Sequence, residues 1–332
     1  MKIINKSDYL EPMLRLSRYK TTAIKTVLLL FLILPLVGFA AEGYASLKIA
    51  AGAREAAMGE VGVAGAKTAD AIRWNPALLN QGSALDISLH HTRWLLGTSQ
   101  SAFFLKRNFG KVALGAEALY FSSGDLELRD SIASSKPIGK YSFADLSLGM
   151  GVAFEVSEGV KVGLIARFYN ERLWKHSGST WGFDAGFAYN PFPELRLGVS
   201  VIDLGFNTRL AAASFRPPVT LRLGTAYSKD WSDEISTALN IDFMYRPYSK
   251  EPGLRTGLEL KLFNLLALRA GAKFLHAEGK KKQDWKMLSP TQMLTFGIGI
   301  AHKGVALDYA LVPYNQMDLG LTHRISLNLS FD

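Results

Sequence analysis

Residues 144–154 read Ala-Asp-Leu-Ser-Leu-Gly-Met-Gly-Val-Ala-Phe, with an apolar or small nonpolar side chain at every second position. Successive side chains of a β-strand point to opposite faces, so this period of two predicts a strand with one apolar face. Residues 160–168 repeat the pattern, with Lys161 and Arg167 among the intervening positions. Similar segments recur from Ser83 to Phe331. The chain is therefore predicted to be all-β.

The alternating segments number about fourteen, and the connections between them alternate in length. Short turns are expected near residues 108–110, 156–159, 190–193, 229–233, 263–264 and 303–304, and long loops over 122–141, 205–218 and 277–290. An even strand number with short turns opposite long loops is typical of bacterial outer-membrane barrels. We expect a 14-stranded antiparallel transmembrane β-barrel in the cell outer membrane, with both termini periplasmic.

Composition agrees with strands that face lipid on one side. Hydrophobic residues make up 48% of the chain and charged residues 20%. After residue 41 no segment offers the roughly twenty continuous apolar residues that a membrane-spanning helix requires. A chain that crosses a membrane with strands must close them into a barrel, because lipid satisfies no backbone hydrogen bonds. The absence of cysteine excludes disulfides, thiolate catalysis and zinc ribbons.

The first 41 residues have the features of a secretory signal peptide. Lys20 and Lys25 precede an apolar run over residues 26–40, and small residues at Ala40 and Ala41 suit a cleavage site. A start at Met13 would give a more usual basic region. Of the net charge of +9, this segment contributes +4, from six basic and two acidic residues. The remaining excess is diffuse, so no nucleic-acid partner is expected.

The second face of the alternating segments carries glycines and charges. Buried unpaired charges are costly, so this face must meet water, opposite charges or a polar plug. The glycines favour barrel curvature and close packing over a direct role in transport. The charged positions include Glu117, Asp145, Asp184, Arg222, Arg255, Glu259, Arg269 and Lys273.

A segment without alternation, residues 42–82, precedes the predicted barrel of residues 83–332. It is rich in small side chains, which would let it fold inside the lumen as a plug, or hatch. Two short helical turns are expected. Asn75 can cap the second turn, and Pro76, which lacks a backbone donor, suits its first position.

The same segment resembles the start of mature PorV/PorQ-family proteins and of the related FadL-type long-chain fatty-acid transporters. Leu78 stands where PorV-like sequences commonly have glycine, and in this it is closer to the transporters. The residues that carry the resemblance are Gly52, Ala53, Arg54, Met58, Gly59, Ala64, Asp70, Ala71, Trp74, Asn75, Pro76, Ala77 and Leu79.

The resemblance implies a hatch that closes a fourteen-stranded barrel and a passive route for hydrophobic ligands, which enter from outside and bind above the hatch. It assigns hatch roles to Arg54, Met58, Asp70, Trp74, Asn75 and Pro76. Alternatively, Trp74, Asn75 and Pro76 have a purely structural role and fix a tight turn. Residues 204–215 either form an apolar entrance, through Leu204, Phe206, Leu210 and Phe215, or pack against one another.

Two further functions are weighed against uptake. PorV-like relatives act in type IX secretion, so the barrel could dock or shuttle secreted proteins. An outer-membrane enzyme is not expected, because Ser88 and His90 share a strand face without an orienting group or an oxyanion site. His90 and His91 point to opposite faces and cannot chelate one metal. No cofactor or metal is expected, and outer-membrane lipid is the expected surrounding partner.

Overall fold

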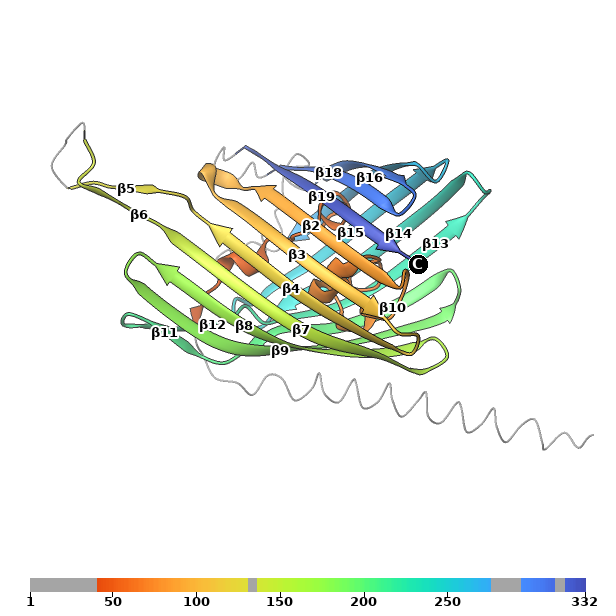
Figure 1. Cartoon of the computed structure of the whole chain (residues 1–332), viewed down its shortest axis with the longest axis horizontal. Coiled ribbons are helices and arrows are strands. Elements are labelled where there is room, and N and C mark those ends of the chain that lie inside the picture. The colour runs from red at the N-terminus through yellow and green to blue at the C-terminus, as the bar shows by residue number, and fades with distance from the viewer. Residues whose placement is uncertain (1–40, 131–135, 276–293, 314–319) are drawn as a thin grey trace, which may run out of the picture. The chain divides into compact units, whose positions relative to one another are not determined.

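The computed structural model describes residues 41–130, 136–275, 294–313 and 320–332; the expected signal peptide, apart from Ala41, and loop 277–290 lie outside them. Within these ranges fourteen strands form a closed antiparallel barrel (Figure 1), which confirms the predicted fold. No helix in the described part of the chain is long and apolar enough to cross a membrane. The wall strands are β2 (Leu85–Arg93), β3 (Ser99–Asn108), β4 (Val112–Ser122), β7 (Phe143–Ser157), β8 (Val160–Leu173), β9 (His176–Phe192), β10 (Leu195–Gly205), β13 (Thr220–Asp230), β14 (Ile235–Arg246), β15 (Glu251–Leu262), β16 (Leu266–Leu275), β17 (Leu294–His302), β18 (Val305–Pro313) and β19 (Leu321–Phe331).

The barrel closes where its last strand meets its first. β19 pairs antiparallel with β2, in a register that runs from Phe331 opposite Leu85 to His323 opposite Arg93. This pairing leaves no free sheet edge, so the wall's backbone donors and acceptors are used within the sheet.

The two faces of the wall differ as the alternation predicts. Met150 in β7 is 74% exposed on the outer surface, whereas Arg167 in the neighbouring β8 is fully buried on the inner one. A hydrocarbon environment would cover this apolar exterior. Other large apolar side chains exposed on the wall strands include Leu89, Phe103, Leu114, Leu164, Phe183, Leu223, Phe243, Leu258, Phe296, Leu307 and Ile325.

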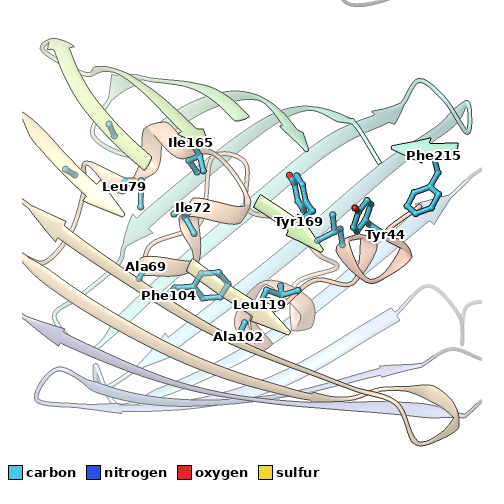
Figure 2. Packing of buried hydrophobic residues seen from close by; sticks show 14 of the residues in the cluster. Tyr44, Ala69, Ile72, Leu79, Ala102, Phe104, Leu119, Ile165, Tyr169 and Phe215 are labelled. Carbon is cyan, nitrogen blue, oxygen red and sulfur yellow. The ribbon is translucent and has the colours of Figure 1, made fainter. Parts of the chain in front are cut away.

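Residues 42–82, the hatch, fold inside the barrel as a chain of short helical turns joined by extended segments (Figures 1 and 2). The predicted helical turns are present, with two more besides. They are short because small residues and glycines permit tight turns but provide little helix stabilisation. The elements are η2 (Ala45–Lys48), α2 (Ala53–Ala57), η3 (Ala69–Arg73) and η4 (Pro76–Leu79).

The chain enters the lumen at the end that carries the long loops. β1 (Ala41–Glu42) pairs in parallel with β12 (Ala213–Arg216), which with β11 (Thr208–Leu210) belongs to the long connection between β10 and β13. Asp332 follows β19 at the opposite end, where the short turns lie. Residue 41, where the expected signal peptide ends, and Asp332 therefore lie at opposite mouths of the barrel. Which mouth faces the periplasm stays a prediction. Because the number of wall strands is even, the wall begins and ends at the same mouth. The hatch crosses the lumen once more, so residue 41 lies at the other mouth.

A hairpin of β5 (Leu126–Leu128) and β6 (Gly139–Tyr141) extends beyond the wall at the long-loop mouth (Figure 1). At the short-turn mouth the connections are tight, such as the two residues between β9 and β10 and the two between β17 and β18. At the other mouth the predicted long connections between β4 and β7 and between β10 and β13 are present, but the connection between β8 and β9 there also has only two residues.

Candidate functional site

The hatch backbone lies directly against glycines of the wall. A Cβ added at Gly271 would lie 2.0 Å from the Gly59 nitrogen, and one added at Gly198 would lie 2.2 Å from the Val63 oxygen. Real Cβ atoms do not approach backbone so closely, so a methyl group at these positions would displace the hatch or the wall. Close packing is thus the role of these glycines. An added Cβ would also lie within 3 Å of hatch backbone atoms at Gly163, Gly186 and Gly257.

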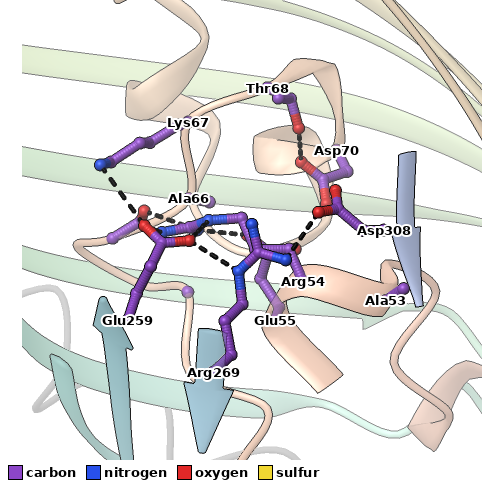
Figure 3. A network of polar contacts seen from close by, with 12 residues as sticks. Ala53, Arg54, Glu55, Ala66, Lys67, Thr68, Asp70, Glu259, Arg269 and Asp308 are labelled. Atoms are coloured by element: carbon purple, nitrogen blue, oxygen red, sulfur yellow. Dashed lines mark hydrogen bonds and ion pairs between the residues drawn. The ribbon is translucent and has the colours of Figure 1, made fainter. Parts of the chain in front are cut away.

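A first ionic cluster joins α2 of the hatch to the wall (Figure 3). Arg54 Nε lies 2.9 Å from Glu259 Oε2, and Arg54 Nη1 lies 2.7 Å from Glu55 Oε1. Arg269 binds the same Glu259 oxygen at 2.7 Å and Asp308 Oδ1 at 2.6 Å. All five side chains are buried. Removing one partner would leave an uncompensated buried charge, so this cluster fixes the position of the helix.

A second cluster surrounds Glu60, the residue after Gly59. Its carboxylate lies 2.6 Å from Arg255 Nη1, 3.2 Å from Lys273 Nζ and 3.5 Å from Arg324 Nη2. Burial alone would raise the pKa of Glu60, but the three cations outweigh it and hold the pKa below its ordinary value. The hatch therefore presents a stable anion to three wall cations.

A third cluster holds the second half of the hatch. Arg73 of η3 lies 3.2 Å from Asp203 Oδ1 and 3.6 Å from Glu117 Oε1. Arg167 of the wall pairs with the same Glu117 and, at 2.6 Å, with Asp184. These groups are buried. The polar face of the wall therefore meets opposite charges and the hatch, as its composition requires.

An irregularity in β10 places Asp203 in that cluster. The pairing of β10 with β9 shifts register between Val201 and Leu204, and Asp203 has a φ of 59°. Bulges redirect side chains and often occur beside functional sites. Here the bulge turns Asp203 inward, where it also accepts a hydrogen bond of 2.9 Å from Tyr169 Oη.

Asn75 braces the hatch in three directions. Its side-chain oxygen accepts from the Ala77 nitrogen at 3.1 Å, and its amide donates to the Val63 and Phe187 oxygens, both at 2.9 Å. Pro76 occupies the first position of η4, as predicted. Asn75 thus caps a turn, ties two hatch segments together and attaches them to β9.

The other predicted hatch residues are also buried. The Trp74 carbonyl oxygen accepts a hydrogen bond of 2.8 Å from Ser200 Oγ, and the Arg222 guanidinium lies 4.7 Å from the centre of the Trp74 ring. Asp70 accepts from Thr68 Oγ1, at 2.5 Å, and the Met58 backbone packs against Gly257. The structure therefore buries these residues within the hatch, and the contact of Asp70 with Thr68 lies inside the hatch itself.

Sequence reasoning missed Glu60 and Arg73, which also make buried ion pairs from the hatch to the wall. Neither lies in the motif that carries the family resemblance. The available signal was indirect: both are charged residues in a segment otherwise rich in small side chains, and the wall's inner face carries charges that require partners.

Apolar side chains of the hatch and of the wall pack together along the lumen, and Tyr44 and Phe215 lie at the end of this cluster toward the long-loop mouth (Figure 2). The Tyr44 ring lies 5.6 Å from that of Tyr169 and 5.5 Å from that of Phe215. Of the expected entrance residues, Phe215 and Leu210 are buried in this cluster, whereas Phe206 is 63% exposed. Residues 204–215 therefore divide between packing inward and facing outward.

His90, the histidine considered from the sequence together with Ser88, is buried in the wall. His90 Nδ1 lies 2.6 Å from Ser326 Oγ, and both groups are buried beneath the hatch. Ser88, the neighbour considered from the sequence, is fully buried. Among the described residues no group of histidines and carboxylates has the arrangement of a metal site.

Comparison with known proteins agrees with this architecture. The sequence model of the family described as type IX secretion system protein PorV matches residues 41–180, which confirms the resemblance to PorV over the hatch and the first wall strands. No curated protein matches the sequence.

Several solved structures share the fold. The Pseudomonas putida toluene transporter TodX is 14% identical, with a TM-score of 0.59 over 87% of this chain and 97% of that one. The Ralstonia pickettii toluene transporter TbuX is 16% identical, with a TM-score of 0.54 over 85% and 98% of the two chains. A Pseudomonas aeruginosa FadL homologue is 11% identical, with a TM-score of 0.55 over 89% and 100%. The chain thus has the fold of FadL-type outer-membrane barrels.

Proposed function

We propose that this protein is a passive outer-membrane channel for hydrophobic small molecules, closed by its hatch. The observation that carries the proposal is the hatch itself, which crosses the lumen and is held there by ion pairs, hydrogen bonds and packing against wall glycines. Such contacts are reversible. The likeness in fold to transporters of toluene supports this reading.

The apolar side chains at the long-loop mouth provide a surface on which a hydrophobic ligand can bind out of water. Transfer of apolar surface from water contributes about 25 cal/mol per Å². A ligand that displaces Phe215 or Tyr44 would also disturb β1, because Phe215 pairs with Ala41. Binding above the hatch would thereby act on the segment that anchors the hatch at that mouth.

The proposal places the long loops outside the cell, the short turns and Asp332 in the periplasm, and lipid around the apolar wall. It includes no catalytic step and no cofactor, and hydrophobic molecules are the partners it requires.

Replacement of Asn75 and Pro76 by alanine tests the hatch. We expect higher ion conductance across planar bilayers, because the buried oxygens of Val63 and Phe187 lose their hydrogen-bond donor. Each buried oxygen left unpaired should destabilise the closed hatch by about 1–3 kcal/mol. Lys140→Ala, in the exposed β6 hairpin, is the matched control. Unchanged conductance together with unchanged uptake of a hydrophobic probe would refute the hatch assignment.

Extraction of bound molecules from the purified protein, followed by mass spectrometry, tests the ligand class. The proposal expects apolar or amphipathic molecules, absent from a variant in which Phe215 is replaced by aspartate. Recovery of the same molecules from both proteins would indicate binding to the outer wall and would count against a lumenal route.

The family match favours a second function, the docking of secreted proteins, since the matching model is described by a secretion system. The β5–β6 hairpin, which projects beyond the wall, would be part of the working surface. Chemical cross-linking in cells, with and without residues 124–141, separates the two functions. Loss of cross-linked secreted proteins with unchanged uptake would favour docking.

A further inference from the structure

A recess opens at the short-turn mouth, between the hatch and the ends of the neighbouring wall strands. Three basic side chains line it: Arg54 and Lys67 of the hatch and Arg196 of β10. Glu194 and Ser228 supply further polar groups at its rim. The recess lies at the opposite mouth from Tyr44 and Phe215, so it is separate from the proposed entrance.

Two of these cations are incompletely neutralised. Lys67 reaches Glu259 only at 3.8 Å, and its side chain is 45% exposed (Figure 3). Arg196 donates to the Ala64 oxygen at 3.1 Å and to the Asn190 side-chain oxygen at 3.3 Å, neither of which is charged. Guanidinium and ammonium groups in this state have hydrogen-bonding capacity left for an anion.

The surroundings of Lys67 add to the positive field. Partial burial lowers the pKa of Lys67, and Arg54, Lys261 and Arg196 act in the same direction, while Glu259 opposes them. Glu259 is already engaged by Arg54, at 2.9 Å. An anion beside Lys67 would relieve the repulsion among these cations.

The charges that line the recess favour a singly charged ligand. Arg54 is already paired with Glu259 and Glu55, which leaves Lys67 and Arg196 against the one lining carboxylate, Glu194, an excess of one positive charge. Glu194 is exposed, so water screens it more than it screens the buried groups. A planar carboxylate also matches the fork of donors on a guanidinium.

We propose that this recess binds a carboxylate group at the short-turn mouth of the barrel. The carboxylate comes either from a small organic acid or from an acidic segment of a periplasmic protein. The site requires no transport by the barrel, so it stands or falls independently of the proposed function.

Protection of the Lys67 amine from acetylation tests the site in the detergent-solubilised full-length protein. A pulse of acetylating reagent at pH 8, read by peptide mass spectrometry, would be run with acetate, octanoate, octanol, tetraglutamate or tetraglycine. We expect a carboxylate to slow acetylation of Lys67 and to leave Lys229 unaffected. Lys229, which packs on Trp231 at the same mouth, is the internal control.

Arg196→Gln provides the matched variant. Loss of one charge-assisted bond should weaken protection by about tenfold in carboxylate concentration. Protection by acetate or octanoate assigns the site to small acids, and protection by tetraglutamate alone assigns it to acidic protein segments. Equal protection by octanol, no protection by any carboxylate, or full protection in Arg196→Gln would overturn the proposal.

Discussion

At the scale of single residues, Glu55 links hatch closure to pH. Burial, followed by the nearby Asp70 carboxyl group, raises the pKa of Glu55 to about 8, and the pairing with Arg54 does not offset this. The closed hatch therefore binds a proton that an open, solvated hatch releases. The contribution of Glu55 to closure is fully present below about pH 4.5 and is lost as the pH rises to about 8.

We predict that conductance rises between about pH 5 and pH 8, by at most about tenfold per pH unit. Glu55→Gln, which keeps the neutral form, should remove most of the rise. Bilayer conductance from pH 5 to 9 measures both proteins. Glu127→Gln, on the exposed β5 strand, should behave like the native protein. A pH response that persists in Glu55→Gln would assign the titration to another group.

The sequence predicts individual residues only where their partners are local. The cap that Asn75 makes with Ala77 spans two positions and could be predicted. Its bond to Phe187 spans 112 positions, and that of Arg54 to Glu259 spans 205. Those pairs depend on which strands flank the hatch, which a single sequence does not specify. The motif therefore indicated important residues without their contacts.

At the scale of elements, the fit between hatch and wall rests on backbone proximity. We predict that Gly271→Ala destabilises hatch closure by about 1–3 kcal/mol, because the added methyl would meet Gly59 and Met58 backbone atoms. The barrel itself should persist, since residue 271 keeps its strand pairing.

Conductance and the heat-dependent gel mobility of folded barrels measure the two effects separately. Gly139→Ala is the control, because its added Cβ would approach only Leu128, at 3.7 Å. Normal conductance in Gly271→Ala would show that the hatch adjusts to a methyl group and that the glycine contacts are not what closes the lumen.

Strands were predicted well because their burial follows strict alternation. Leu148, Met150 and Leu164 face outward while Ser147 and Arg167 face inward, as expected. The exception is instructive. Alternation fails at Val201, Ile202 and Asp203, which are all buried, and the failure marks the bulge that supplies Asp203 to the hatch. The break in the alternation of β10 is therefore the signal that marks the position of Asp203.

At the scale of the whole molecule, the direction in which the hatch crosses the lumen could not be predicted. The strand count returns Leu85 and Phe331 to one mouth, but nothing in residues 42–82 indicates where residue 41 emerges. That position is determined by the pairing of Ala41 with Phe215, a contact between distant segments with no pattern of its own. The relation between strand number and topology therefore predicts where the wall begins and ends but not the path of the hatch.

The proposed orientation can be measured directly because the chain has no cysteine. A single cysteine at Glu127, in the projecting hairpin, should react with a membrane-impermeant maleimide on intact cells. One at Lys303, in the tight turn between β17 and β18, should react only after the outer membrane is opened. Both positions are exposed, so a difference in labelling reports the side of the membrane and not burial. If only Lys303→Cys is labelled on intact cells, the barrel has the opposite orientation to the one proposed, and the carboxylate recess lies outside the cell.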